Sequence, residues 1–193
     1  MIGLITNPFC PYCYGNDRTL EKEIPTLSDE DIMLMPMDLT PDVQEFDDKL
    51  YARYHKMFND EALPYLHKKG LMNAKYYKQE NIAPSKLVFL SYYVLREFNK
   101  GLDFYHEVTK RFYETDFYYG DKENLAKIVE FLGVDKEVYF KMLEDKKFES
   151  MFEEYQDLVE DSMIDTVPCY VIDGEVYFSI TKGVAELKNR LDK

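Results

Sequence analysis

The first forty residues consist of two short apolar runs separated by a segment of helical length. Residues 2–6 and 31–38 have the length and apolar character of buried strands. Between these runs, a helix is predicted to begin at Cys10 and to end near Glu23, before Pro25. Strand, helix and strand at this spacing predict a parallel βαβ unit.

The middle of the chain, residues 41–163, shows helical periodicity and no convincing strand pattern. We predict helices from a Ser85 cap after Pro84 to Gly101, around residues 104–113, from an Asp121 cap to Gly133, and over residues 136–160.

The C-terminal residues return to strand patterning. Residues 166–172 and 175–178 are rich in strand formers and are joined by Asp173-Gly174, which predicts a hairpin with a type I′ turn. A last amphipathic helix, with Thr181 as its cap, follows. Residues 1–40 and 164–193 are therefore expected to form one α/β domain, and residues 41–163 a helical domain inserted into it.

Composition excludes several classes of function. The 193 residues include 24 Lys and Arg against 37 Asp and Glu, a formal net charge of −13, which argues against a nucleic acid or an anionic membrane as partner. No run reaches the roughly 20 apolar residues of a membrane span, and no cationic stretch precedes an apolar signal core. We therefore expect a soluble, cytoplasmic protein.

Three cysteines are too few for a disulfide framework, but Cys10 and Cys13 form a C-x-x-C pair. In a reducing compartment this spacing indicates redox chemistry or a metal. A structural zinc site needs four ligands, and no second C-x-x-C supplies them. His55, His67 and His106 stand singly, without ligand spacing. Redox chemistry without a metal is the favoured interpretation.

The position of the pair at a predicted helix start assigns a role to each sulfur. Cys10 would face free N–H groups and the positive end of the helix dipole, which favour the thiolate, so Cys10 is the candidate nucleophile. Cys13, one turn into the helix, would resolve a mixed disulfide. Cys169 is expected to be a small buried strand residue, although an alternative disulfide could form if it approached Cys10.

Two motifs carry a family resemblance. Residues 10–15, C-P-Y-C-Y-G, resemble the C-P-W-C-Y-x-G of cytoplasmic FrnE-like proteins, and residues 167–174, V-P-C-Y-V-I-D-G, resemble their V-P-x-F-x-I-D-G. The chain is identified as a member of the DsbA family of the thioredoxin superfamily, FrnE-like branch. The resemblance implies a thioredoxin-like α/β fold with a large all-helical insertion between the βαβ unit and the C-terminal ββα unit.

The resemblance also implies the roles of further residues. Pro168 would be a cis proline against the sulfurs, and the backbone of Val167 would pair with a substrate segment beside Cys10, while Pro11 and Tyr12 would line the approach. Tyr12 stands where periplasmic DsbA has a histidine, which argues against a strong oxidant. The Cys-Pro-Tyr-Cys string resembles that of glutaredoxins, whose potentials of about −200 to −230 mV favour reduction or isomerisation of disulfides in the cytosol.

The expected substrate is a protein disulfide or a small thiol, and no cofactor is expected beyond glutathione as an electron donor. Two alternatives remain open. Some DsbA-like proteins act as non-catalytic adaptors that present a transcription factor to the ClpXP protease, and the Asn7-Pro8 opening resembles theirs. Glutathione-dependent isomerases and transferases share the architecture, but they typically hold serine at the position of Cys10.

Overall fold

A computed structural model describes residues 2–37, 39 and 47–192. Its sheet has the strand order β2-β1-β3-β4. The strands are β1 (Ile2–Thr6), β2 (Met33–Pro36), β3 (Cys169–Ile172) and β4 (Glu175–Tyr177). β1 pairs in parallel with β2 and antiparallel with β3, which in turn pairs antiparallel with β4. The predicted βαβ unit and hairpin are confirmed; residue 38 and the predicted domain boundary at 40–41 lie outside the described residues.

The helix between β1 and β2 is α1 (Pro11–Glu23). Cys10 is its N-cap, with φ −87° and ψ 118°, and Pro11 follows in the first turn. Proline suits this position because its fixed φ is helical and its missing N–H would have no partner within the helix. The helix ends before Pro25, as predicted.

The two faces of the sheet are covered by different helices. Leu4 and Leu34 belong to the main core with residues of α1 and of α9 (Ile180–Leu191). Ile5 and Met35, which alternate with them, pack against Val159 in a second cluster. This period of two is what a sheet buried on both faces requires.

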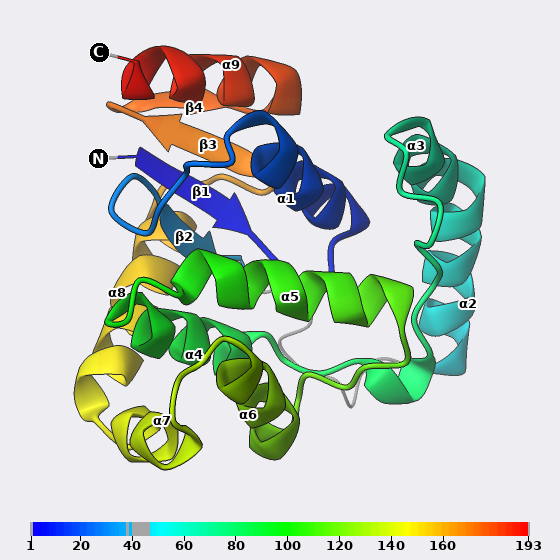
Figure 1. The fold of residues 1–193 in the computed structure, drawn as a ribbon. Helices are drawn as coiled ribbons and strands as arrows, with labels where there is room; N and C mark the ends of the chain where they lie inside the picture. The colour runs from blue at the N-terminus through cyan, green and yellow to red at the C-terminus, as the bar shows by residue number, and fades with distance from the viewer. Residues whose placement is uncertain (1, 38, 40–46, 193) are drawn as a thin grey trace.

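Between β2 and β3, the regular elements of the described residues are all helical, as predicted. In order they are α2 (Asp48–Met57), the π-helical turn η2 (Phe58–Ala62), α3 (Leu63–Lys68), the 3₁₀ turn η3 (Gln79–Asn81), α4 (Lys86–Arg96), α5 (Gly101–Glu114), α6 (Lys122–Phe131), α7 (Lys136–Leu143) and α8 (Lys146–Asp161). The molecule thus has a thioredoxin-like sheet with a helical insertion. Figure 1 shows α2 and α3 standing beside the end of α1 at which Cys10 lies.

Three predicted boundaries were wrong. The helix predicted over 136–160 is two helices, because the Asp145 side chain accepts a hydrogen bond from Lys147 N–H at 3.0 Å and caps a new one. Gly101 does not end the preceding helix: α4 ends earlier, and Gly101 begins α5, where its N–H donates to Asp29 at 2.7 Å. The last helix is capped by Ser179, and Thr181 lies within its first turn.

Two other local predictions hold at the level of the backbone. Asp173 and Gly174 both have positive φ, 50° and 89°, as a type I′ turn requires. Ser85 is the N-cap residue of α4, but its side chain makes no capping hydrogen bond.

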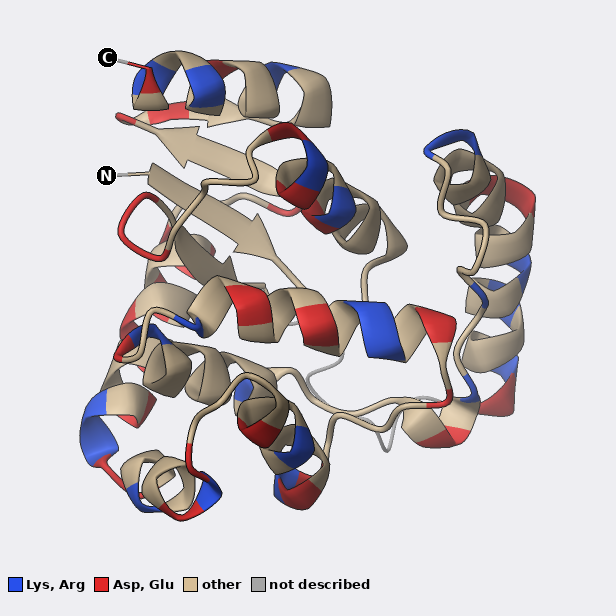
Figure 2. Cartoon of the chain, viewed as in Figure 1, with Lys and Arg blue, Asp and Glu red and all other residues tan. Residues whose placement is uncertain are grey.

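Charged residues are concentrated on the helices and loops, whereas β1, β2 and β3 carry none (Figure 2). The first charged residue of α1 is Asp17, so the end of α1 that holds Cys10 is uncharged. None of the described helices combines the length and apolar character needed to cross a membrane.

Candidate active site

The turn between β1 and α1 presents Cys10. Buried Asn7 holds this turn, since its side chain accepts from Phe9 N–H at 2.7 Å and donates to the Met37 carbonyl at 2.7 Å. The Cys10 N–H also donates to the Asn7 carbonyl at 3.1 Å. Through Asn7, the N-cap residue Cys10 is therefore tied to the ends of both parallel strands.

The two cysteines of the pair are reduced and unequal in exposure. Cys10 is 6% exposed and Cys13 is 1% exposed. The Cys10 sulfur accepts from the Cys13 N–H at 3.4 Å. A hydrogen bond from the Cys13 thiol lowers the pKa of Cys10; burial opposes this, and the backbone N–H groups of Cys13 and Tyr12 lower the pKa further. The Cys13 thiol is therefore the main group that favours the Cys10 thiolate, and the N–H groups at the start of α1 add to its effect.

Cys13 has the opposite character. Burial, and then its hydrogen bond to Cys10 and the charge there, raise its pKa well above the ordinary value, while the Thr6 hydroxyl and the Asn7 backbone act in the other direction. The Thr6 hydroxyl is in turn 3.0 Å from the Tyr105 hydroxyl. A hydroxyl of β1, that of Thr6, therefore lies beside the buried Cys13 sulfur.

The segment before β3 lies against Cys10. The peptide bond between Val167 and Pro168 is cis, and the Cys10 thiol donates to the Val167 carbonyl at 3.8 Å across 157 residues of sequence. Strand pairing causes this approach, because Ile5 near the end of β1 is opposite Cys169 at the start of β3. The structure thus brings Cys10, Cys13 and Val167 together.

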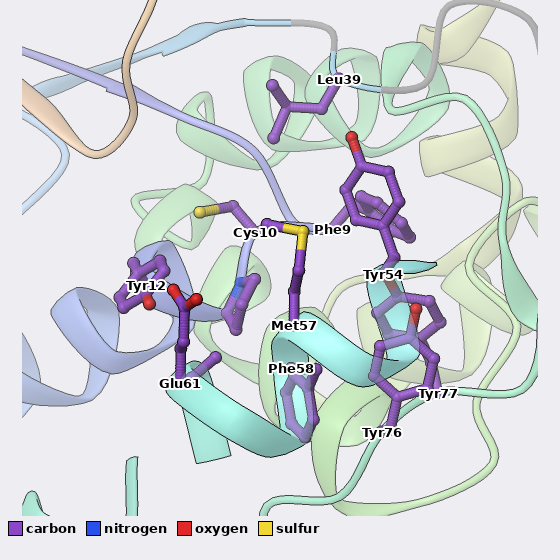
Figure 3. Close-up of a pocket in the computed structure, with 12 residues that line it drawn as sticks. Phe9, Cys10, Tyr12, Leu39, Tyr54, Met57, Phe58, Glu61, Tyr76 and Tyr77 are labelled. Carbon is purple, nitrogen blue, oxygen red and sulfur yellow. The ribbon is translucent and has the colours of Figure 1, made fainter. Parts of the chain in front are cut away.

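A groove opens beside Cys10, which we call the aromatic groove. It encloses about 620 Å³, open solvent at its mouth included. Its lining residues are Phe9, Cys10, Pro11, Tyr12, Leu39, Tyr54, Met57, Phe58, Glu61, Ala62, Tyr76 and Tyr77. Figure 3 shows Cys10 between Tyr12 and Glu61 on one side and Tyr54, Tyr76 and Tyr77 on the other. Helix α2 and turn η2 supply one wall, and the first residues of α1 supply the other.

The sequence indicated part of this groove. Pro11 and Tyr12, the predicted substrate-binding residues of this segment, are among the residues that line the groove. The Tyr12 ring packs against Tyr65 at 5.3 Å between centroids. Glu61 was not anticipated, because its position in the groove follows from how α2 and η2 pack beside α1 and not from a local motif.

A buried ionic cluster joins α1 to α5. The Asp17 carboxylate accepts hydrogen bonds from His106 and from the Thr109 hydroxyl, the latter at 2.5 Å, and pairs with Arg18 at 2.9 Å. Burial raises the pKa of Asp17, but the charges of His106 and Arg18 and these hydrogen bonds outweigh it and hold the pKa below its usual range. Burial lowers the pKa of His106, but Asp17 reverses this and leaves it raised.

Cys169 and His106, two further residues that the sequence singled out, lie away from the aromatic groove and contribute to packing and ion pairing. Cys169 is fully buried in the cluster of Ile5, Met35 and Val159, and burial raises its pKa to about 11. It is the buried strand residue that was expected. His106, which stands alone in the sequence, pairs with Asp17. In the described part of the chain, no group of three or more His, Cys, Asp or Glu side chains is arranged to hold a metal ion.

Comparison with known proteins places this geometry in a family. Residues 6–192 match the family model of the DSBA-like thioredoxin domain. The chain belongs to the DSBA-like thioredoxin family. The expected relationship to DsbA proteins is thereby confirmed, and so is the thioredoxin-like fold with its helical insertion.

Individual relatives are distant. The chain is 24% identical over 180 residues to Uncharacterized protein YwbO of Bacillus subtilis strain 168, covering 91% of this chain and 88% of that protein. Its fold is similar to a probable DsbA oxidoreductase from Streptomyces coelicolor, with a TM-score of 0.73 at 14% identity, over 100% of this chain and 90% of that one. The cytosolic disulfide reductase DsbM from Pseudomonas aeruginosa has a TM-score of 0.65 at 13% identity, over 99% of this chain and 98% of that one.

Proposed function

We propose that the protein is a cytoplasmic thiol-disulfide oxidoreductase of the FrnE-like branch that reduces or isomerises disulfides with Cys10 and Cys13. The observation that carries the proposal is the contrast between the two sulfurs. Cys10 caps a helix beside the Val167 carbonyl with a lowered pKa, and Cys13 behind it has a raised pKa. An attacking thiolate backed by a protonated resolving thiol is what disulfide exchange requires.

The reaction proceeds in two exchanges. The Cys10 thiolate attacks one sulfur of the substrate disulfide, the substrate S–S bond breaks, and the other substrate sulfur departs and takes the proton of Cys13. Cys13 then attacks Cys10, releasing the second substrate thiolate and forming the Cys10–Cys13 disulfide. Two electrons pass from the pair to the substrate, and an external thiol reductant, glutathione or a dithiol protein, restores the pair. In isomerisation the second exchange joins a different pair of substrate sulfurs, without net electron transfer.

The neighbouring residues have supporting roles in this proposal. Val167, whose carbonyl faces Cys10, would pair with the substrate backbone, and Pro168 would hold that segment against the sulfurs. Pro11 and Tyr12 would contact the substrate from the other side, since both line the aromatic groove. The Thr6 hydroxyl would orient the Cys13 thiol for the resolving step.

Direction of electron flow decides between a reductase and an oxidant. We expect the Cys10–Cys13 couple to have a potential in the glutaredoxin range, about −200 to −230 mV, because Tyr12 carries no cationic imidazole that would stabilise the reduced form further. Equilibrating the protein in glutathione redox buffers and counting free thiols by mass spectrometry measures this potential. A potential near the −120 mV typical of a strong oxidant would contradict reduction as the direction. A pair that never oxidises would favour the adaptor alternative.

A further inference from the structure

The aromatic groove beside Cys10 is apolar along most of its length. Phe9, Phe58 and Ala62 form its buried floor, each 3% exposed. Tyr54 and Met57 on its rim are 37% and 45% exposed, so large apolar side chains remain in contact with water there. An apolar side chain that entered the groove would remove this surface from water, a change that is favourable in proportion to the area covered.

The groove also carries a negative charge on one side, at Glu61. Among the described residues that line the groove, Glu61 is the only one with a charged side chain. Glu61 lies close enough to Tyr12 to raise the pKa of that phenol, after burial, which is the larger cause. Figure 3 shows the Glu61 carboxylate on the side of the groove where Tyr12 and Cys10 lie.

A second negative charge would be poorly tolerated at this place. The positive end of α1, which would otherwise attract an anion, already acts on the Cys10 sulfur. The net charge of −13 adds an unfavourable long-range field. Glutathione disulfide carries two carboxylates on each half, whereas a peptide with lysine or arginine beside its cysteine would meet Glu61 with the opposite sign.

We propose that the aromatic groove binds an extended peptide disulfide whose cysteine is flanked by an aromatic side chain and a basic side chain, and that Glu61 selects this peptide over anionic disulfides such as glutathione disulfide. This inference rests on the proposed oxidoreductase function and names its substrate class. The aromatic side chain enters the groove beside Tyr54 and Met57, and the basic side chain lies at the rim beside Glu61. The same selection favours a dithiol protein over glutathione as the reductant.

The test uses four short peptides, each with one cysteine in a mixed disulfide with the same fluorescent thiol. The residues flanking the cysteine are Phe and Lys, Phe and Glu, Gly and Lys, or Gly and Glu. Specificity constants for reduction by the 193-residue protein are measured with a dithiol reductant. We expect the Lys peptides to exceed the Glu peptides by about three- to tenfold, the range of a partly exposed charge pair. The Phe peptides should exceed the Gly peptides by about tenfold or more.

Variants at Glu61 and at the neighbouring Asp60 separate the effect of the Glu61 charge from that of the net charge of the protein. Glu61→Lys should invert the Lys-over-Glu preference and keep the Phe-over-Gly preference. Asp60→Lys makes the same change of net charge in the same turn, η2, at a residue that does not line the groove, and it should retain the wild-type order. In 1 M salt the charge preference of the wild type should disappear, because the screening length falls to about 3 Å.

The possible outcomes distinguish an error in the proposed substrate class from an error in the proposed oxidoreductase function. Reduction of all four peptides at similar rates, or an equal effect of Glu61→Lys and Asp60→Lys, would overturn the substrate class and leave the oxidoreductase function standing. Failure of the wild type to reduce any peptide above the uncatalysed rate would overturn both. Inversion by Glu61→Lys alone supports the inference.

Discussion

Replacing Cys10 with serine should reduce the rate of disulfide reduction to the uncatalysed rate. A serine hydroxyl has no accessible anion near neutral pH, so the hydrogen bond from Cys13 and the start of α1 would have no thiolate to stabilise. The measurement is turnover of a mixed-disulfide substrate under a dithiol reductant, with the wild type and Cys10→Ser compared at equal concentration. The fold should survive because the change is isosteric at a helix N-cap, where serine is favoured.

Two matched variants define the roles of the other cysteines. Cys13→Ser should still attack substrate through Cys10, and it should accumulate the mixed disulfide that Cys13 normally resolves. Cys169→Ser should keep wild-type turnover, because that thiol is buried in the apolar cluster behind β1 and β3 with a pKa raised to about 11. Turnover by Cys10→Ser at the wild-type rate would remove Cys10 from the mechanism.

The second large effect concerns stability. Asp17→Asn should lower the free energy of unfolding by about 3–5 kcal/mol, the usual cost of removing one partner from a buried ion pair. The carboxylate is 6% exposed and accepts from both His106 and Thr109, so the change leaves buried donors without their charged partner. Urea unfolding, followed by circular dichroism at a fixed pH, measures the difference.

The pH dependence of this cluster follows from the two pKa directions. The pKa of Asp17 is depressed in the folded protein. Its contribution to the free energy of unfolding is therefore present above the pKa of the unfolded chain, about 3.9, and is lost as the pH falls through the folded pKa. The pKa of His106 is raised, so its contribution is complete below about 6.5 and is lost as the pH rises through the folded pKa. The cluster should therefore stabilise the folded protein most between about pH 4 and pH 6.5.

A double-mutant cycle with His106→Gln tests the coupling. The two substitutions together should cost less than the sum of each alone, because either one breaks the same pair. The exposed pair of Lys86 and Glu149, at 2.8 Å, supplies a control: Glu149→Gln should leave the unfolding midpoint unchanged. Additive effects of Asp17→Asn and His106→Gln, or a flat difference between wild type and variant across pH, would contradict the account of the cluster.

Local sequence signals predicted the frame of the molecule. Pro11 after Cys10 and Pro25 after the helix mark both ends of α1, because the φ of Pro11 suits the first helical position and Pro25 disfavours a helical backbone at Ile24 before it. Asp173-Gly174 fixed the hairpin because both residues tolerate positive φ. The expected approach of Val167 to Cys10 came from the resemblance to a family, and the pairing of β1 with β3 provides its physical basis.

Other features depend on packing between distant segments and have no local signature. The apolar stripe that continued through residues 136–160 hid the break at Asp145, where a cap competes with helix continuation. His106 stands alone in the sequence and meets Asp17 across 89 residues only because α5 packs on α1. Glu61 reaches the groove by the same kind of tertiary contact, between η2 and α1.

The most direct test of the central claim is the pH dependence of alkylation of the reduced wild-type protein. Iodoacetamide labelling should be followed by mass spectrometry of each cysteine, with a free cysteine peptide in the same tube as reference. Cys10 should be labelled with a half-maximal rate at lower pH than the peptide, while Cys13 and Cys169 stay unlabelled, because burial raises the pKa of both. A midpoint for Cys10 at or above that of the peptide, or earlier labelling of Cys13, would contradict a helix-stabilised thiolate at position 10.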